Sequence, residues 1–197
     1  MQTRSEETRG RIVQSALKLF ADQGYDATGV AEICKSSGVS KGAFYHHFPS
    51  KQAVFLVLLQ EWLQGLDKEL GRAMSASSNV PEGLLAMASE MQGVFAAADG
   101  RLSLFLEFWQ QARRDPAVWK ELIAPYRRYR DYFAQIVQTG IDEGSLRPVD
   151  AQAAGQALVA LAVGIVVQGV LDPGGAQWDV VTRDALQLLI TGLSSGR

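Results

Sequence analysis

The residues that could do chemistry in this chain gather in one short stretch, from Thr28 to Lys51. Within it, residues 41–47 combine a cation, a position without a side chain, a phenol and an imidazole, at Lys41, Gly42, Tyr45 and His46. Cations, phenols and imidazoles hydrogen-bond phosphate oxygens and base edges, and a glycine lets the backbone approach a groove closely. On one exposed helix face, these residue types are typical of a surface that reads DNA.

Two short helices joined by a tight turn would position these side chains. Thr28 is suited to cap a first short helix, and Gly38 supplies the left-handed backbone position that ends it. Ser40 is suited to cap a second short helix over residues 41–47. This order of elements is that of a helix-turn-helix. Apolar residues would hold the two helices together and against their neighbours, at Ile33, Val39, Phe44 and Phe48.

Apolar residues at helical spacing predict further helices on both sides of this motif. A first helix is expected over about residues 6–23, and a long amphipathic helix, capped by Ser50, reaches about residue 72. Beyond a polar loop, helices are expected at about 82–97, 102–113, 117–142, 151–171 and 178–194, with Asp150 as a cap. No alternation typical of strands occurs. We therefore predict an all-α fold of about nine helices.

The composition limits the class of protein further. The 197 residues are 47% apolar and 20% charged, which suits a folded chain rather than a disordered one. Residues 1–51 hold seven Lys and Arg against five Asp and Glu, whereas the rest of the chain is acidic. No apolar run approaches the roughly 20 residues that span a bilayer, no signal peptide is recognisable, and the one cysteine excludes an internal disulfide. We expect a cytoplasmic, soluble protein without a membrane partner.

Residues 8–55 resemble the DNA-binding domain of the TetR family of bacterial transcriptional regulators. The resemblance rests on the turn Ser37-Gly38-Val39-Ser40 and above all on the run from Lys41 to Lys51. It implies DNA-phosphate contacts by Thr28, Ser40, Tyr45 and Lys51. It also implies that Lys41, Gly42 and His46 lie nearest the base edges of the major groove. His47 is a weaker candidate, because the residue at this position in the family more often packs or bonds to backbone. An operator duplex is thus the expected partner, and repression the common mode.

The second half of the chain is rich in aromatic residues with polar tips. Apolar walls with a few polar groups are typical of small-molecule sites, although aromatics at helical spacing also simply form cores. The residues expected to bind a small-molecule effector are Trp62, Leu66, Met87, Met91, Phe105, Phe108, Trp109, Arg113, Tyr126, Tyr129, Phe133 and Gln168. Residues 1–50 are therefore expected to form the DNA-binding domain, and residues 51–197 the ligand-binding and dimerisation domain.

A basic cluster flanks these aromatic residues, at Arg113, Arg114, Arg127, Arg128 and Arg130. Two interpretations stay open. The arginines pair at the surface with Asp115, Glu121 and Asp131, or they hold an anionic ligand such as the phosphates of an acyl-CoA, which some TetR-like regulators sense.

The helix expected at 151–171 is small-sided and apolar on nearly every face between Leu158 and Val167. Such a helix is buried on more than one side. With the helix at 178–194 it would form a four-helix interface between two copies of the chain, as in TetR relatives. The alternative is burial within one chain.

No arrangement of residues suggests an enzyme. The chain has no nucleophile and base at catalytic spacing, no phosphate loop and no metal-ligand pattern, so no catalytic residue, metal or cofactor is expected. His46 and His47 are adjacent, about 100° apart on a helix, and rarely chelate one ion. Cys34 fits a buried structural thiol better than a redox switch.

Together these features predict a homodimeric regulator. We predict that this chain is a repressor, which leaves its operator when a small apolar, aromatic or acyl-CoA-like effector binds the second domain. The alternative is a helix-turn-helix regulator controlled by protein partners without a small ligand.

Overall fold

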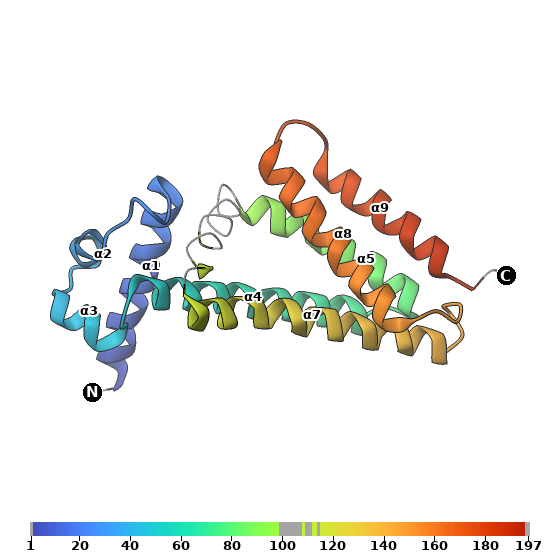
Figure 1. The fold of residues 1–197 in the computed structure, drawn as a ribbon, viewed down its shortest axis with the longest axis horizontal. Coiled ribbons are helices and arrows are strands. Elements are labelled where there is room, and N and C mark those ends of the chain that lie inside the picture. The colour runs from blue at the N-terminus through green and yellow to red at the C-terminus, as the bar shows by residue number, and fades with distance from the viewer. Residues whose placement is uncertain (1, 99–107, 109–111, 114, 196–197) are drawn as a thin grey trace. The chain divides into compact units, whose positions relative to one another are not determined.

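The computed structural model describes residues 2–98, 108, 112–113 and 115–195, and for residues 2–3 and 90–98 it describes the backbone alone. Eight helices make up this part of the chain (Figure 1): α1 (Gln2–Gln23), α2 (Val30–Ser37), α3 (Lys41–His47), α4 (Lys51–Ser75), α5 (Val80–Ala98), α7 (Pro116–Asp142), α8 (Ala151–Leu171) and α9 (Trp178–Leu193). The prediction of an all-α fold is confirmed, with close to the expected nine helices. The helix expected at 102–113 falls mainly outside the described residues.

By its internal packing the chain divides into two compact units. Unit 1 consists of Met1–Gln64 and Gly100–Leu122, and unit 2 of Gly65–Asp99 and Ile123–Arg197. Helices α4 and α7 therefore contribute residues to both units. The functional boundary expected after residue 50 stays a prediction.

In unit 1, the first three helices and the start of α4 enclose an apolar core. Helix α1 packs against α2, and α2 against α3. Ile33 and Phe44 are fully buried and Phe48 nearly so, as predicted for the residues that hold the motif together, whereas Val39 is partly exposed. Gly38 has φ +67°, the left-handed conformation that ends α2 and starts the turn. The predicted helix-turn-helix geometry is therefore present.

Four aromatic rings form a second part of this core, and we call Phe20, Tyr25, Phe55 and Phe108 the aromatic cluster. Phe55 and Phe108 stack with their centroids 3.9 Å apart. Tyr25 meets both rings edge-on, at 5.5 Å from Phe55 and 5.2 Å from Phe108, and lies 5.2 Å from Phe20. Such pairs add about 0.5–1.5 kcal/mol each beyond the area that they bury. Phe108 thus joins the second stretch of unit 1 to the first.

Three of the predicted helix caps are confirmed. The Ala43 amide donates to Ser40 Oγ at 3.1 Å, which satisfies a free N–H at the start of α3. Ser50 Oγ accepts from an amide of α4 at 3.2 Å, and Asp150 Oδ1 accepts from two amides of α8 at 2.9 and 3.2 Å.

The prediction that Thr28 caps α2 is wrong. The N-cap residue of α2 is Gly29, whose amide donates to Glu32 Oε2 at 2.8 Å. The Thr28 hydroxyl donates instead to the carbonyl of Gly24, at 2.8 Å. The end of α1 offers this carbonyl inside the fold, and the Thr28 side chain is buried against it.

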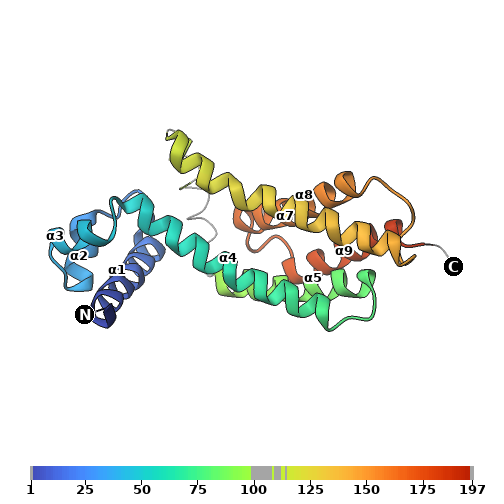
Figure 2. The same cartoon turned by 90° about the horizontal axis from the view of Figure 1, so that it is seen from below.

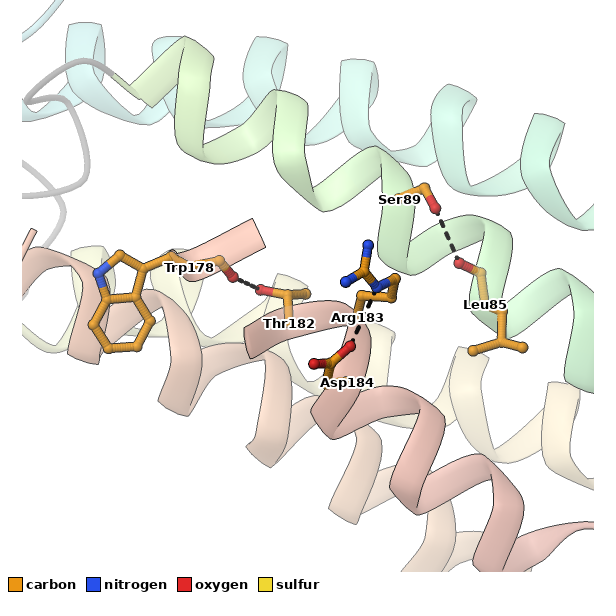
Figure 3. Close-up of polar contacts among 6 residues, drawn as sticks. All are labelled: Leu85, Ser89, Trp178, Thr182, Arg183 and Asp184. Atoms are coloured by element: carbon orange, nitrogen blue, oxygen red, sulfur yellow. Dashed lines mark hydrogen bonds and ion pairs between the residues drawn. The ribbon is translucent and has the colours of Figure 1, made fainter. Parts of the chain in front are cut away.

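In unit 2, α9 packs against both α5 and α8, and α8 and α9 run antiparallel on either side of the turn at 172–177 (Figures 1 and 2). The core includes Leu84, Val137, Leu158 and Ile190. The polar contacts drawn along α5 and α9 in Figure 3 stay within one helix: the Thr182 hydroxyl donates to Trp178 O and Arg183 pairs with Asp184. Buried apolar residues of α5 and α9, among them Leu84 and Ile190, belong to the same core cluster.

One end of unit 2 is closed by backbone pairing between the turn after α7 and the residues after α9. The Arg147 amide donates to Leu193 O at 2.9 Å, and the Ser195 amide to Ser145 O at 3.2 Å. Glu143 Oε1 accepts from the Val80 amide at 2.8 Å. The hydrogen bond from Ser145 and, to a smaller extent, this bond from Val80 lower the pKa of the Glu143 carboxyl. These contacts attach the start of α5 to the end of α7.

Helix α8 is the one helix of the described residues that is long and apolar enough to cross a bilayer, by length and composition only. The sequence analysis did not identify α8 as a candidate span because its longest uninterrupted apolar run ends at Gln156 on one side and at Gln168 on the other. The helix as a whole is nevertheless apolar. Only 28% of its most apolar 18 residues are buried inside the chain. The core helix of a folded protein also meets these criteria of length and composition, so they do not place α8 in a membrane.

Gly155 of α8 lies directly against α7. A Cβ atom built on this glycine would come 2.5 Å from the backbone nitrogen of Ala134 and 2.8 Å from its Cα. Backbone cannot move aside as the tip of a side chain does, so α7 and α8 can approach this closely only if residue 155 has no side chain.

We expect Gly155→Ala to lower the free energy of unfolding by about 1–3 kcal/mol, the usual cost of overpacking. The matched control is Gly71→Ala, also in a helix of unit 2, where an added Cβ meets no atom within 4 Å. This control should be neutral or stabilising by up to about 1 kcal/mol, because alanine favours helix. Urea unfolding followed by circular dichroism measures both, and equal stabilities for the two variants would contradict the packing argument.

Candidate nucleic-acid interface and effector residues

The exposed face of α3 carries the residues that the sequence singled out. Lys41, Gly42, Tyr45 and His46 are exposed, and the Tyr45 side chain is 55% accessible although aromatic. Phe44 points the other way and is fully buried, in edge-on contact with the Tyr45 ring at 5.3 Å. Burial of Phe44 therefore fixes the rotation of α3 about its axis, and this rotation presents the four residues together.

The residues at the two ends of α3 differ from this face. Ser40 is exposed and its hydroxyl already accepts the capping bond. His47 is half-buried, with its ring 5.2 Å from that of His46 at 75°. Within the described part of the chain, no three His, Cys, Asp or Glu side chains come together as a metal site would require. Because His46 is exposed and His47 is half-buried, His46 is the better placed of the two to contact DNA.

Thr28 and Lys51, expected as phosphate contacts, have internal surroundings. The Thr28 side chain is 1% exposed, and its hydroxyl also accepts from Gln23 Nε2 at 3.3 Å. Lys51 is half-buried, and its ammonium donates to the carbonyls of Tyr25 and Thr28 at 2.6 and 2.9 Å. Six of the eight predicted DNA-binding residues therefore lie on or at the ends of α3, and two support the loop before α2.

The structure adds two cations that the sequence reasoning missed. The Arg9 guanidinium lies over the ring of Phe48 at 5.3 Å, beside the end of α3. Arg11 Nη1 lies 3.8 Å from the position of a Cβ on Gly38, beside the turn before α3. Both arginines are exposed on α1. The excess of basic residues in the first 51 positions was the one sequence signal for them.

Cys34 lies in α2 and is 6% exposed. Its neighbour Ser37 is also buried, and its hydroxyl donates to Ile33 O at 2.6 Å. The thiol is thus a buried part of the motif, as the sequence analysis favoured.

Four of the predicted effector residues belong to the core of unit 2 or pack against it. Met87 is part of that core and is 4% exposed, and Leu66, Tyr129 and Phe133 pack against the core while staying partly exposed. They come from three helices, α4, α5 and α7. Tyr129 adds a hydroxyl to this apolar set.

The partner of that hydroxyl is a residue that the sequence reasoning missed. Tyr129 Oη donates to Asp67 Oδ1 at 2.6 Å, and Arg128 Nη1 lies 2.8 Å from Asp67 Oδ2. Burial, followed by the bond to Asp67, raises the pKa of Tyr129 well above its ordinary value, so this phenol stays protonated and donates. No local pattern could pair residues more than 60 positions apart.

The other predicted effector residues have separate surroundings. Tyr126 Oη accepts from Gln156 Nε2 at 2.7 Å, in unit 2. Gln168 is exposed on α8, and its amide donates to Gly164 O of its own helix. In unit 1, Trp62 is 37% exposed, Arg113 is exposed and Phe108 is fully buried in the aromatic cluster. Met91 lies on α5, and the structure describes its backbone alone. Phe105 and Trp109 lie outside the described residues.

The basic cluster follows neither interpretation completely. Arg128 pairs with Asp67, a partner that was not considered, and Arg130 lies 3.7 Å from Asp131, one of the expected surface partners. Arg127 is exposed, and Arg114 lies outside the described residues.

Helix α3 has one buried face and one exposed face, and a turn that begins at the left-handed Gly38 joins it to α2. This arrangement defines a helix-turn-helix protein. Comparison with known proteins agrees. Residues 12–58 match the model of bacterial regulatory proteins of the tetR family, and residues 81–191 match that of the BetI-type transcriptional repressor C-terminal domain. The chain belongs to the TetR family of transcriptional regulators, which are not enzymes.

Individual relatives are distant. The transcriptional regulator UidR of Escherichia coli K12 is 27% identical over 148 residues, 75% of this chain and 74% of its own length. A regulator of Saccharomonospora viridis, solved in complex with choline, superposes with a TM-score of 0.80 at 24% identity, over 98% of this chain and 100% of its own. FadR of Bacillus subtilis, solved with stearoyl-CoA, gives 0.76 at 20% identity, over 93% and 98%. At these identities the two structures establish the fold alone.

The exposed Tyr45 hydroxyl gives a first test of the α3 face. If it donates to a phosphate, Tyr45→Phe should weaken binding to all DNA sequences alike, by roughly tenfold for one charge-assisted hydrogen bond. The variant keeps the ring that contacts Phe44, so the melting temperature should not change.

Fluorescence anisotropy titrations with the operator and with an unrelated duplex measure this. The control is His46→Ala, which should alter base preference, because His46 lies among the expected base-reading residues. A Tyr45→Phe variant that changed only base preference would show that the phosphate assignment is wrong.

Proposed function

We propose that this TetR-family chain is a repressor that binds an operator as a dimer and leaves it when unit 2 binds a small molecule. The observation that carries the proposal is the face of α3, where Lys41, Gly42, Tyr45 and His46 are exposed together while Phe44 anchors the helix. The Tyr45 ring contacts Phe44, but more than half of its side chain is exposed, and the lysine and the imidazole beside it are not part of the core. DNA contact explains why all four are on the surface.

We further propose that the effector is apolar, aromatic or acyl-CoA-like and binds near Leu66, Met87, Tyr129 and Phe133. These side chains offer an apolar surface with one phenol, which suits such ligands. The solved relative with stearoyl-CoA favours an acyl chain, and the one with choline favours a small quaternary ammonium as the competing class. Arg128 is paired with Asp67, so its guanidinium is engaged rather than ready for a phosphate.

The proposed mechanism is a shift between two conformations of the dimer. In one, the two copies of α3 fit successive major grooves about 34 Å apart, and in the other they do not. The effector shifts the equilibrium only by its difference in affinity for the two conformations. Helices α4 and α7 both contribute residues to the two units, but α4 also follows α3 directly along the chain, so we expect α4 to transmit the change.

The proposed dimer interface consists of α8 and α9. Leu171 at the end of α8 is 75% exposed and Leu188 on α9 is 78% exposed, and most of the apolar residues between Leu161 and Val170 are only partly buried within the chain. Large exposed apolar patches on folded proteins usually mark interfaces. A second copy covering these helices would remove this surface from water, in a cytoplasmic protein that does not enter a membrane.

The first experiment is a gel shift of the purified protein with the intergenic DNA upstream of its own gene. We expect retardation that one class of compound abolishes, from a panel of acyl-CoAs, neutral aromatics and choline. Loss of retardation with acyl-CoA or aromatics would support the proposed effector class, and loss with choline alone would exclude it. Retardation that no compound disturbs would favour control by a protein partner instead.

The dimer gives a second prediction. Leu188→Glu places a charge at the centre of the proposed interface and should convert the dimer to a monomer in sedimentation velocity, with DNA affinity reduced at least about tenfold. Gln135→Glu adds the same charge on the exposed surface of α7 and should leave the dimer intact. If Leu188→Glu sediments as the wild type does, the interface lies elsewhere.

A further inference from the structure

Lys51, the first residue of α4, has surroundings unlike those of a lysine that faces a ligand. Its ammonium lies 2.6 Å from Tyr25 O and 2.9 Å from Thr28 O, and 4.1 Å from the centroid of the Tyr25 ring. An ammonium has three donors in a compact group, and these contacts engage it with two carbonyls and the face of an aromatic ring. They join α4 to a loop more than 20 residues earlier in the chain.

The loop held in this way is residues 24–29, between α1 and α2. Tyr25 at its start is fixed by the aromatic cluster and is 2% exposed, and Thr28 near its end is fixed by the bond to Gly24 O. The next residue, Gly29, is the N-cap of α2. Lys51 therefore bonds near both ends of the loop, and the Thr28 carbonyl that it binds belongs to the residue directly before the N-cap of α2.

From these contacts we propose that Lys51 is a positioning residue, which raises DNA affinity by holding the 24–29 loop and the start of α2 in place rather than by neutralising a phosphate. The inference rests on the proposed function, since it concerns how the motif is prepared for DNA. It differs from the role that the family resemblance implied for this lysine. Charge-assisted hydrogen bonds to carbonyls are stronger than neutral ones, so their loss would loosen the loop.

The two roles predict different measurements. A lysine that contacts a phosphate releases a counterion on binding, so its removal flattens the dependence of log K on log salt by about 0.9. A positioning lysine leaves that slope unchanged and instead lowers affinity at every salt concentration. Its removal also lowers the melting temperature of the protein without DNA, which a surface phosphate contact would not affect.

The test compares Lys51→Met with Lys41→Met, an exposed lysine of α3, in anisotropy titrations over a range of salt concentrations and in thermal melts without DNA. We expect Lys51→Met to lose about tenfold in affinity with an unchanged slope and a lower melting temperature. Lys41→Met removes an exposed cation from the face assigned to DNA, so it should flatten the slope, alter base preference as well, and melt as the wild type does. A flattened slope with an unchanged melting temperature for Lys51→Met would overturn the proposal.

Lys51→Arg keeps the inference testable if Lys51→Met does not fold. Arginine is an excellent phosphate ligand, so a phosphate contact would tolerate this change. A planar guanidinium does not fit between two carbonyls and the Tyr25 ring as an ammonium does, so the positioning role predicts weaker binding and an altered near-ultraviolet tyrosine spectrum. Wild-type affinity and spectrum for Lys51→Arg would overturn the proposal. Wild-type protein that binds no DNA would instead overturn the proposed function, while the melts decide the role of Lys51 independently.

Discussion

The packing of one buried tyrosine ring is the interaction on which unit 1 depends. Tyr25 lies between the Lys51 ammonium and three phenylalanine rings, so a single side chain contacts α1, α4 and the segment that contains Phe108. Burial of this ring fixes the loop after α1, the loop fixes the start of α2, and α2 supports α3. The exposed face that we assign to DNA is thus the last member of a series of contacts that begins in the core. The position of this face therefore depends on residues in the core of unit 1.

The parts of the fold that follow from local rules could be predicted from the sequence. Ser40, Ser50 and Asp150 act as caps because each meets amides two or three residues further on, which depends on the local backbone alone. The face of α3 also followed, since Phe44 had to be inside. The prediction for Thr28 was wrong because its hydroxyl had two possible local partners, the amides of α2 and the Gly24 carbonyl, and it bonds the carbonyl. The Gly29 to Glu32 spacing, that of a capping box, was the signal that could have corrected it.

The contacts between distant residues could not be predicted in the same way. Lys51 with the Tyr25 carbonyl and Asp67 with Tyr129 join positions 26 and 62 residues apart, and neither pair has a local pattern that links its members. Both cases involve a charged or polar side chain that the sequence suggests should face solvent or a ligand. Helical periodicity indicates which side of a helix is apolar, but it does not indicate which loop carbonyl or carboxylate the neighbouring element will offer.

Unit 1 is built from two separate stretches of the chain, and Phe108, from the second of them, stacks on Phe55. The DNA-binding half of this regulator is therefore not a portable module that ends with the last residue of its motif. A chimera that joined residues 1–50 to the sensor of another regulator would bring a foreign residue to the position of Phe108, against Tyr25. A transplant that preserved this core would have to carry the motif together with the aromatic residue that completes the core.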